Sequence, residues 1–284
     1  MSEGGAPRPI PASPLGPKTL GEIIEGTFRV YGTGFLGILL IAAVVQVPLA
    51  LLDIWVFSVL ESAIDDLFGY LNANSFLNPS IDSSMVAEEF RTVVIVGGIF
   101  LLTTVLTFII MDGALIYAVS VEILEGPIAV LRAYSFAAGR FGAMLGVSMV
   151  AALGVLLMAI TIVGIPFAIY FSVRWAFVIQ VALLERRNPA SSLARSSDLV
   201  RDNWWRAFGV LLLIGIALAI ANRLAGIILD LIPCVGPMVV AVLSAPVLII
   251  AQTLLYHDLR VRRDGPVGYN PKILASELHN PSGL

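Results

Sequence analysis

The sequence has very few of the residues on which most metal and nucleophilic sites depend. Among 284 residues there are one cysteine and two histidines. Cys234 has no partner for an intramolecular disulfide, and two histidines far apart in the chain give no cluster at zinc-ligand spacing. A Walker-type glycine-rich loop and a serine–histidine–acid arrangement are absent as well. We therefore expect no metal, no cofactor and no catalytic residues; a membrane-bound lipid-modifying enzyme is the weaker alternative.

Charge is also scarce. Only 13% of the residues are charged, whereas 58% are hydrophobic, and a soluble domain carries roughly 25% charged residues. Long uncharged runs approach or exceed the ~20 apolar residues that span a bilayer. We therefore predict an all-α fold, a polytopic transmembrane bundle of six helices with short amphipathic helices at its cytoplasmic surface. The expected spans lie near residues 35–57, 93–119, 142–162, 165–184, 206–229 and 237–257.

The two ends of the chain are rich in proline and polar residues and contain no apolar segment. We expect a disordered tail over residues 1–18, a single membrane domain over 19–264 and a flexible tail over 265–284. Within the domain, "IVGIPF" predicts a tight turn between the third and fourth spans, because proline suits the first position of a helix and glycine suits its end.

The basic residues predict the orientation. With both termini in the cytoplasm, Arg91, Arg174 and Arg223 are the only Lys or Arg residues outside the cytoplasmic segments. The outer segment 58–92 is acidic instead. Because cytoplasmic loops carry an excess of Lys and Arg, we predict a multi-pass protein of the cell membrane with both termini inside.

Three segments share one layout, in which an amphipathic stretch and a basic or aromatic hinge precede a span. They begin near Leu20, Ile128 and Pro189, and each is expected to lie in the cytoplasmic interface. Membrane lipids, through anionic headgroups, are the expected partners; a protein partner stays open, and no nucleic acid is expected. The predicted interfacial anchors are Phe28, Arg29, Tyr31, Arg195, Arg201, Trp204, Trp205, Arg206, Tyr256 and Arg260.

Four ionisable residues fall inside the expected spans, where such residues are rare and functional by default. Asp112 and Arg174 lie at similar distances from the cytoplasmic ends of their helices, and Asp53 and Arg223 at similar distances from the starts of theirs. The spacing predicts two interhelical ion pairs, Asp112–Arg174 and Asp53–Arg223. A solute or proton path and lipid-facing side chains are the alternatives.

Several motifs resemble a known family. "GEIIEGTFRVYGTGF", "NPASSLARSSDLVRDNWWRAFGVLLL" and "TLLYHDLRVRRDG" are similar to the bacterial and archaeal membrane domain attached to some glycerophosphoryl diester phosphodiesterases, and to its standalone relatives. The resemblance covers roughly residues 19–264. In those enzymes a separate barrel of ~250 residues carries out the hydrolysis, and nothing resembling that barrel follows here. The phosphodiesterase activity is therefore not expected of this chain.

Two functions follow from these observations. The first is a non-catalytic integral membrane protein that organises lipid or a protein partner at the cytoplasmic membrane. The alternative is a transporter or permease subunit with a polar path that includes Asp112 and Arg174.

Overall fold

The computed structural model describes residues 16–71, 83–124, 126–229 and 235–279. Every regular element in these ranges is helical, which confirms the all-α fold class. Residues 1–15 of the expected N-terminal tail and residues 230–234 between the last two spans lie outside the described residues. The helices are α1 (Leu20–Thr33), α2 (Phe35–Leu71), α3 (Ser83–Ile123), α4 (Val130–Ala138), α5 (Phe141–Ala159), α6 (Ile165–Arg174), α7 (Val178–Leu184), α8 (Pro189–Val200), the 3-10 helix η1 (Arg201–Asn203), α9 (Trp204–Leu229), α10 (Val235–Gly268) and α11 (Pro271–His279).

Within the described residues, six helical segments are long and apolar enough to cross a membrane. They cover residues 35–69, 86–123, 141–159, 165–184, 189–227 and 238–265. This number agrees with the six spans expected from the apolar runs. Length and composition together indicate an integral membrane protein.

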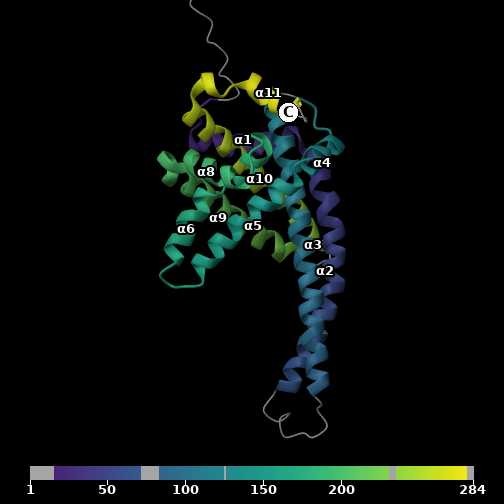
Figure 1. Ribbon diagram of the computed structural model, residues 1–284. Helices are drawn as coiled ribbons and strands as arrows, with labels where there is room; N and C mark the ends of the chain where they lie inside the picture. The colour runs from purple at the N-terminus through teal and green to yellow at the C-terminus, as the bar shows by residue number, and fades with distance from the viewer. Residues whose placement is uncertain (1–15, 72–82, 125, 230–234, 280–284) are drawn as a thin grey trace, which may run out of the picture.

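The first two long helices exceed their expected spans. α2 has 37 residues and α3 has 41, so at ~1.5 Å per residue they are about 55 and 60 Å long. They lie side by side and extend well below the other helices in Figure 1. The apolar run ends near residue 57, but backbone hydrogen bonding continues past Glu61 and Asp65. Hydropathy locates the apolar part of a helix and not its end.

The three-fold layout of a short helix followed by a long one is confirmed. α1 leads into α2 through Gly34, α4 leads into α5 through residues 139–140, and α8 leads into α9 through η1. Local capping fixes two of these starts. Thr19 and Glu22 form a capping box at α1, and the Asn188 side chain accepts a hydrogen bond from the Ser191 backbone N–H at 2.9 Å. We call α1, α4, α8 and α11 the short-helix layer; these helices gather at the top of Figure 1.

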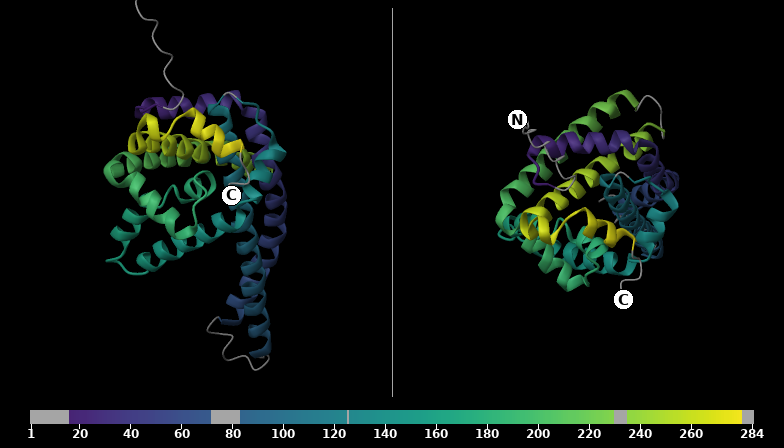
Figure 2. Two further views of the ribbon diagram at one scale, coloured as in Figure 1. Left: turned by 45° about the horizontal axis from the view of Figure 1, so that its top comes forward. Right: turned by 90° about the horizontal axis from the view of Figure 1, so that it is seen from above.

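α10 is the helix around which the others assemble. It packs against α1, α2, α3, α8 and α9, and Figure 2 shows α9 and α10 running across the α2–α3 hairpin rather than along it. Several of its apolar side chains, among them Ile250, Leu255 and Leu259, are fully buried in the main core. The helix bends at Gly265, whose φ of 71° lies in the left-handed region that glycine tolerates. This bend turns the chain back over the end of α10.

The fourth span is broken in its middle, which the sequence did not indicate. α6 ends at Arg174 and α7 begins at Val178. The Ser196 hydroxyl of α8 donates to the Arg174 carbonyl at 2.7 Å and accepts from the Phe177 N–H at 3.3 Å. The Gln252 side chain of α10 donates to the Ala176 carbonyl. Side chains of neighbouring helices therefore satisfy backbone groups that the break leaves free.

Part of the expected C-terminal tail is folded. Residues 271–279 form α11, and its Leu274 and Leu278 are buried in the core. Sequence composition favoured a flexible tail because the apolar residues here are few. Two leucines at i and i+4 are nevertheless enough to give this short helix a buried face.

The turn between α5 and α6 depends on Gly164, and its replacement provides a test of the fold. A Cβ at this position would lie 1.8 Å from the Met158 carbonyl oxygen. We expect Gly164→Ala to lower the free energy of unfolding by roughly 1–3 kcal/mol, the usual range for overpacking. Gly209→Ala is the control, because a Cβ there meets nothing within 4 Å. Thermal denaturation in detergent measures both; equal midpoints for the two variants would contradict this turn geometry.

Candidate functional site: a buried charge network beneath the short helices

The predicted interfacial anchors divide into two groups. Phe28 is 64% exposed and Trp205 is 77% exposed, and Arg29 and Arg201 are exposed as well. The remaining anchors are buried or half-buried and contact protein groups; they are Tyr31, Arg195, Trp204, Arg206, Tyr256 and Arg260. Tyr256 and Arg260 are the clearest correction, because α8 and α11 cover the end of α10 and remove these two side chains from the surface.

Arg260 is the centre of what we call the charge network, formed by Glu185, Arg195, Arg260, Asp264 and Glu277. Its guanidinium makes two hydrogen bonds to the Glu277 carboxylate, Nη1 to Oε2 at 2.9 Å and Nη2 to Oε1 at 2.6 Å. Its Nε lies 3.7 Å from Glu185 Oε1 and 3.6 Å from Asp264 Oδ2. The Arg260 side chain is only 8% exposed. A single buried cation thus contacts carboxylates from the end of α7, from α10 and from α11.

Arg195 of α8 completes the charge network. Its Nε donates to Glu185 Oε2 at 3.0 Å, and its Nη2 donates to Asp264 Oδ2 at 2.5 Å. The Tyr256 hydroxyl donates to Glu185 Oε1 at 3.1 Å and accepts from Arg260 at 3.2 Å. Buried ions are tolerated when they are both paired and hydrogen-bonded. Every charged group of the network has an ion-pair partner, and Arg260 Nε is the one nitrogen of that guanidinium buried without a hydrogen bond.

The returning chain places a tyrosine over the network. The Arg260 guanidinium carbon lies 4.0 Å from the centre of the Tyr269 ring, within cation–π range. Burial raises the pKa of the Tyr269 hydroxyl well above its usual value, so this group stays protonated and can donate. Burial also raises the pKa of Glu277, an effect that its hydrogen bonds and charge interaction with Arg260 oppose.

His257 lies beside the charge network in a fully hydrogen-bonded position. Its Nδ1 is 2.6 Å from the Tyr269 hydroxyl and its Nε2 is 3.3 Å from the Ser120 hydroxyl. Because Ser120 gives its proton to the Ile116 carbonyl at 2.8 Å, we assign the proton of the imidazole to Nε2. Nδ1 then accepts from Tyr269. Both ring nitrogens are occupied, which leaves this histidine without a free position for acid–base chemistry.

A second buried node is built on Asp258, whose side chain is fully buried. It accepts from the Lys18 backbone N–H at 2.6 Å, from Arg206 Nε at 3.0 Å and from Arg262 Nε at 3.0 Å. Arg206 and Arg262 also donate to the Lys18 carbonyl. The node therefore attaches the segment entering α1 to the start of α9 and the end of α10.

The two most distinctive sequence motifs meet in these contacts. Arg263 pairs with Asp198 at 2.5 Å and with Asp202 at 2.7 Å, and Arg206 pairs with Asp258. The motifs "NPASSLARSSDLVRDNWWRAFGVLLL" and "TLLYHDLRVRRDG" thus contribute opposite charges to one interface between α8, η1, α9 and α10. The four-residue spacing of Asp258 with Arg262 and of Arg260 with Asp264 is a signal from which these two ion pairs could have been predicted. No signal in the sequence indicates Glu277 as a partner.

The predicted intramembrane pairs do not form. Among the ion pairs of the described residues, neither Asp112–Arg174 nor Asp53–Arg223 is present. Arg174 instead lies over its own helix neighbours, 5.5 Å from the Tyr170 ring centre. Equal depth did not imply proximity: α3 packs mainly against α2, α4 and α10, whereas α6 packs against α5, α8 and α9. The second predicted pair joins Asp53 of α2 to Arg223 of α9, and both of these helices pack against α10.

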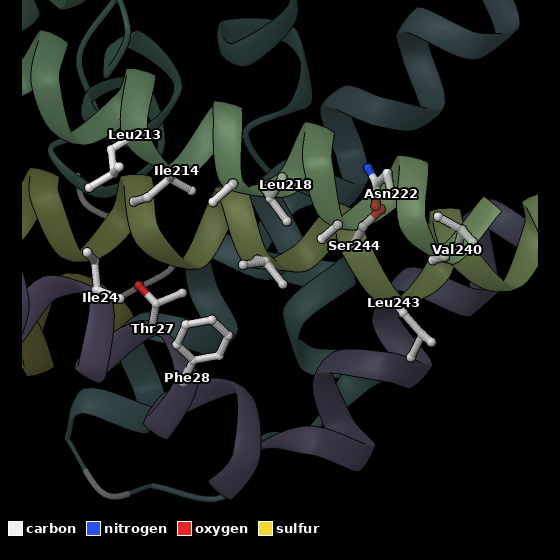
Figure 3. Close-up of a pocket in the computed structure, with 14 residues that line it drawn as sticks. Ile24, Thr27, Phe28, Leu213, Ile214, Leu218, Asn222, Val240, Leu243 and Ser244 are labelled. Atoms are coloured by element: carbon white, nitrogen blue, oxygen red, sulfur yellow. The ribbon is translucent and has the colours of Figure 1, made fainter. Parts of the chain in front are cut away.

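The protein also has an apolar groove, whose lining includes none of these charged residues. It is formed by α1, α9 and α10 and has a volume of about 350 Å³. In Figure 3 Phe28 and Ile24 approach it from α1, Leu213 and Leu218 lie along α9, and Asn222 and Ser244 lie close together with Val240 beyond them. The groove is of the size at which small-molecule sites begin, ~300 Å³, and its lining suits a hydrocarbon chain.

The charge network joins several helices through ion pairs, and we call this arrangement the clamp. Its carboxylates accept from arginines or a tyrosine, and its two arginines face carboxylates on several sides. Within the described part of the chain, no group of three or more His, Cys, Asp or Glu residues is arranged to hold a metal ion. The arrangement therefore fixes the relative positions of α7, α8, α10 and α11.

Removal of the central cation tests the clamp. Arg260→Leu leaves Glu277 and Glu185 buried without their partner, so we expect a loss of roughly 3–5 kcal/mol in unfolding free energy. Glu277→Leu added to this variant removes one orphaned charge and is expected to recover part of the loss. Arg29→Leu is the control, because its pair with Glu25 is exposed and such pairs contribute ~0–1 kcal/mol. If Arg260→Leu cost no more than the control in denaturant unfolding, the clamp would be disproved.

Comparisons with protein-family models, with curated proteins and with solved structures found no match. The resemblance to the membrane domain of glycerophosphoryl diester phosphodiesterases therefore stays a prediction that depends on the quoted motifs.

Proposed function

We propose that this chain is a non-catalytic integral membrane protein that organises anionic lipid at the cytoplasmic face of the cell membrane, using its short-helix layer. The observation that carries the proposal is that the short helices expose large apolar side chains, and that η1 exposes an arginine without an ion-pair partner among the described residues. Phe28 on α1, Leu131 on α4 and Trp205 beside η1 are 64%, 81% and 77% exposed. Exposed apolar side chains of this size favour contact with lipid rather than water.

Arg201 supplies the charge in this arrangement. It is exposed in η1, and within the described residues it has no ion pair or hydrogen bond through its side chain. It lines an open hollow together with Trp204, Trp205 and Tyr170. Tryptophan at the membrane boundary buries its ring while its N–H stays near polar groups, and a nearby arginine contributes ~1 kcal/mol of attraction to an anionic surface.

The buried charge network supports the same function. Organising lipid requires the short helices to keep fixed positions relative to one another. The network and the Asp258 node attach α8, α11 and the start of α1 to α10 through buried charges. The groove between α1, α9 and α10 lies at this layer and offers a place for one acyl chain.

A transport function has one observation in its favour. The fourth span is broken at residues 175–177, and near the break Arg174 Nε and Gln180 Oε1 are buried without hydrogen-bond partners. Transporter sites are often built at broken helices. However, Ser196 and Gln252 already occupy the freed backbone groups, and the predicted partner Asp112 is not paired with Arg174. We therefore favour lipid organisation.

Lipid binding by the purified protein tests this proposal. Native mass spectrometry in detergent yields apparent dissociation constants for phosphatidylglycerol and phosphatidylcholine. We expect the anionic lipid to bind more tightly, and Arg201→Gln to weaken it about fivefold, the equivalent of ~1 kcal/mol per arginine near the surface. Arg91→Gln is the control, since Arg91 lies near the start of α3 and pairs with Glu88. Equal affinity for both lipids, or an equal effect of the control, would contradict the proposal.

A further inference from the structure

A small pocket lies where α4 meets α5, with two arginines in its wall. It is lined by Ser135, Phe136, Gly139, Arg140 and Arg186, and its volume is about 50 Å³. We propose that this pocket is a binding site for a phosphate group, held between the guanidinium groups of Arg140 and Arg186. A space of this size exceeds the ~30 Å³ that one water molecule occupies in the liquid and suits a small anionic group.

The charge of the pocket calls for an anion. The lining contains two cations and no acidic residue. Arg140 makes no ion pair or side-chain hydrogen bond within the described part of the chain, and Arg186 donates to a backbone carbonyl, that of Glu277, at 3.3 Å. Burial and the nearby Arg186 lower the pKa of Arg140, as expected for two like charges in a partly desolvated site. An anion between them would remove this repulsion.

The α5 backbone adds to the positive potential. Arg140 is the N-cap residue of this 19-residue helix, and its side chain gives no capping hydrogen bond. The first N–H groups of a helix have no partner within it and carry a partial positive charge of ~0.5. The pocket lining reaches Arg140, so the start of α5 lies at the edge of the pocket and its partial positive charge adds to that of the two guanidinium groups.

The fold holds Arg186 in place. It is the residue between α7 and α8, and its φ of 52° lies in the left-handed region, which is uncommon for a residue other than glycine. Its neighbours Glu185 and Arg187 pair with each other at 3.0 Å. Arg186 therefore separates from the charge network and reaches toward α4, while α11 restrains its guanidinium through the Glu277 carbonyl.

The phosphate can belong to a lipid headgroup or be free in solution, and the two sources share the same chemistry. The choice of a lipid rests on the proposed function. It is supported by Leu131 of the adjoining α4, which is 81% exposed and would enter the apolar phase beside the pocket. The anion site itself depends only on the geometry of Arg140, Arg186 and the start of α5.

Calorimetric titration of the purified protein tests the site. The probes are inorganic phosphate and the soluble lipid dihexanoyl phosphatidic acid. We expect both to bind, and Arg140→Gln and Arg186→Gln each to weaken binding roughly tenfold, the scale of one charge-assisted hydrogen bond. Arg140→Lys is expected to restore part of the affinity. Arg132→Gln removes an exposed arginine from the same helix pair and should change neither titration. Thermal midpoints identify any variant that fails to fold.

The outcomes separate the two proposals. Binding of the lipid alone assigns the site to headgroups, and binding of both probes assigns it to the phosphate itself; either result supports the site if Arg140→Gln reduces it. No binding of either probe, or an equal loss in Arg132→Gln, overturns the site. If inorganic phosphate binds and Arg140→Gln abolishes it while phosphatidylglycerol and phosphatidylcholine bind equally, the lipid function fails and the anion site stands.

Discussion

The two-pronged hydrogen bond between Arg260 and Glu277 is the interaction on which the rest of the short-helix layer depends. α11 buries only a small apolar face, so this buried ion pair is what attaches it to α10. With α11 in place, Tyr269 and Leu274 are buried, and the Tyr269 ring lies over the Arg260 guanidinium. The same guanidinium faces Glu185 and Asp264, which hold Arg195 and with it α8. One cation therefore positions helices from three separate parts of the chain.

This arrangement explains why a chain with few charges places so many of them in one region. Charges in an apolar environment are costly unless each finds a partner. Here the paired groups lie at the end of α10, where the long apolar helices meet the short amphipathic ones. The buried ion pairs favour one relative arrangement of the helices, because a carboxylate and a guanidinium can pair in few alternative positions. Other side chains, such as Arg201 and Trp205, are exposed and remain accessible to the surroundings of the protein.

The apolar features of the fold could be predicted from the sequence, and the polar contacts could not. Runs of hydrophobic residues and the amphipathic stretches that precede three of them indicated the helices and their short-then-long order, because both are local patterns. The ends of α2 and α3 were missed, since helical hydrogen bonding continues after hydropathy falls. Asp112 and Arg174 were matched by depth alone, which gives no lateral position. Tyr256 and Arg260 were taken for surface groups because nothing local shows that α11 folds back over them.

The most direct measurement of the central claim is hydrogen–deuterium exchange on the wild-type protein and on Arg260→Leu, resolved by helix. If the buried pair attaches the short helices to α10, the amides of α11 and α8 exchange faster in the variant, while those of the α2–α3 hairpin keep their wild-type rates. Unchanged protection of α11 in the variant would contradict the account, because other contacts, such as its two buried leucines and the bond from Arg186 to the Glu277 carbonyl, would then be enough to hold the helix.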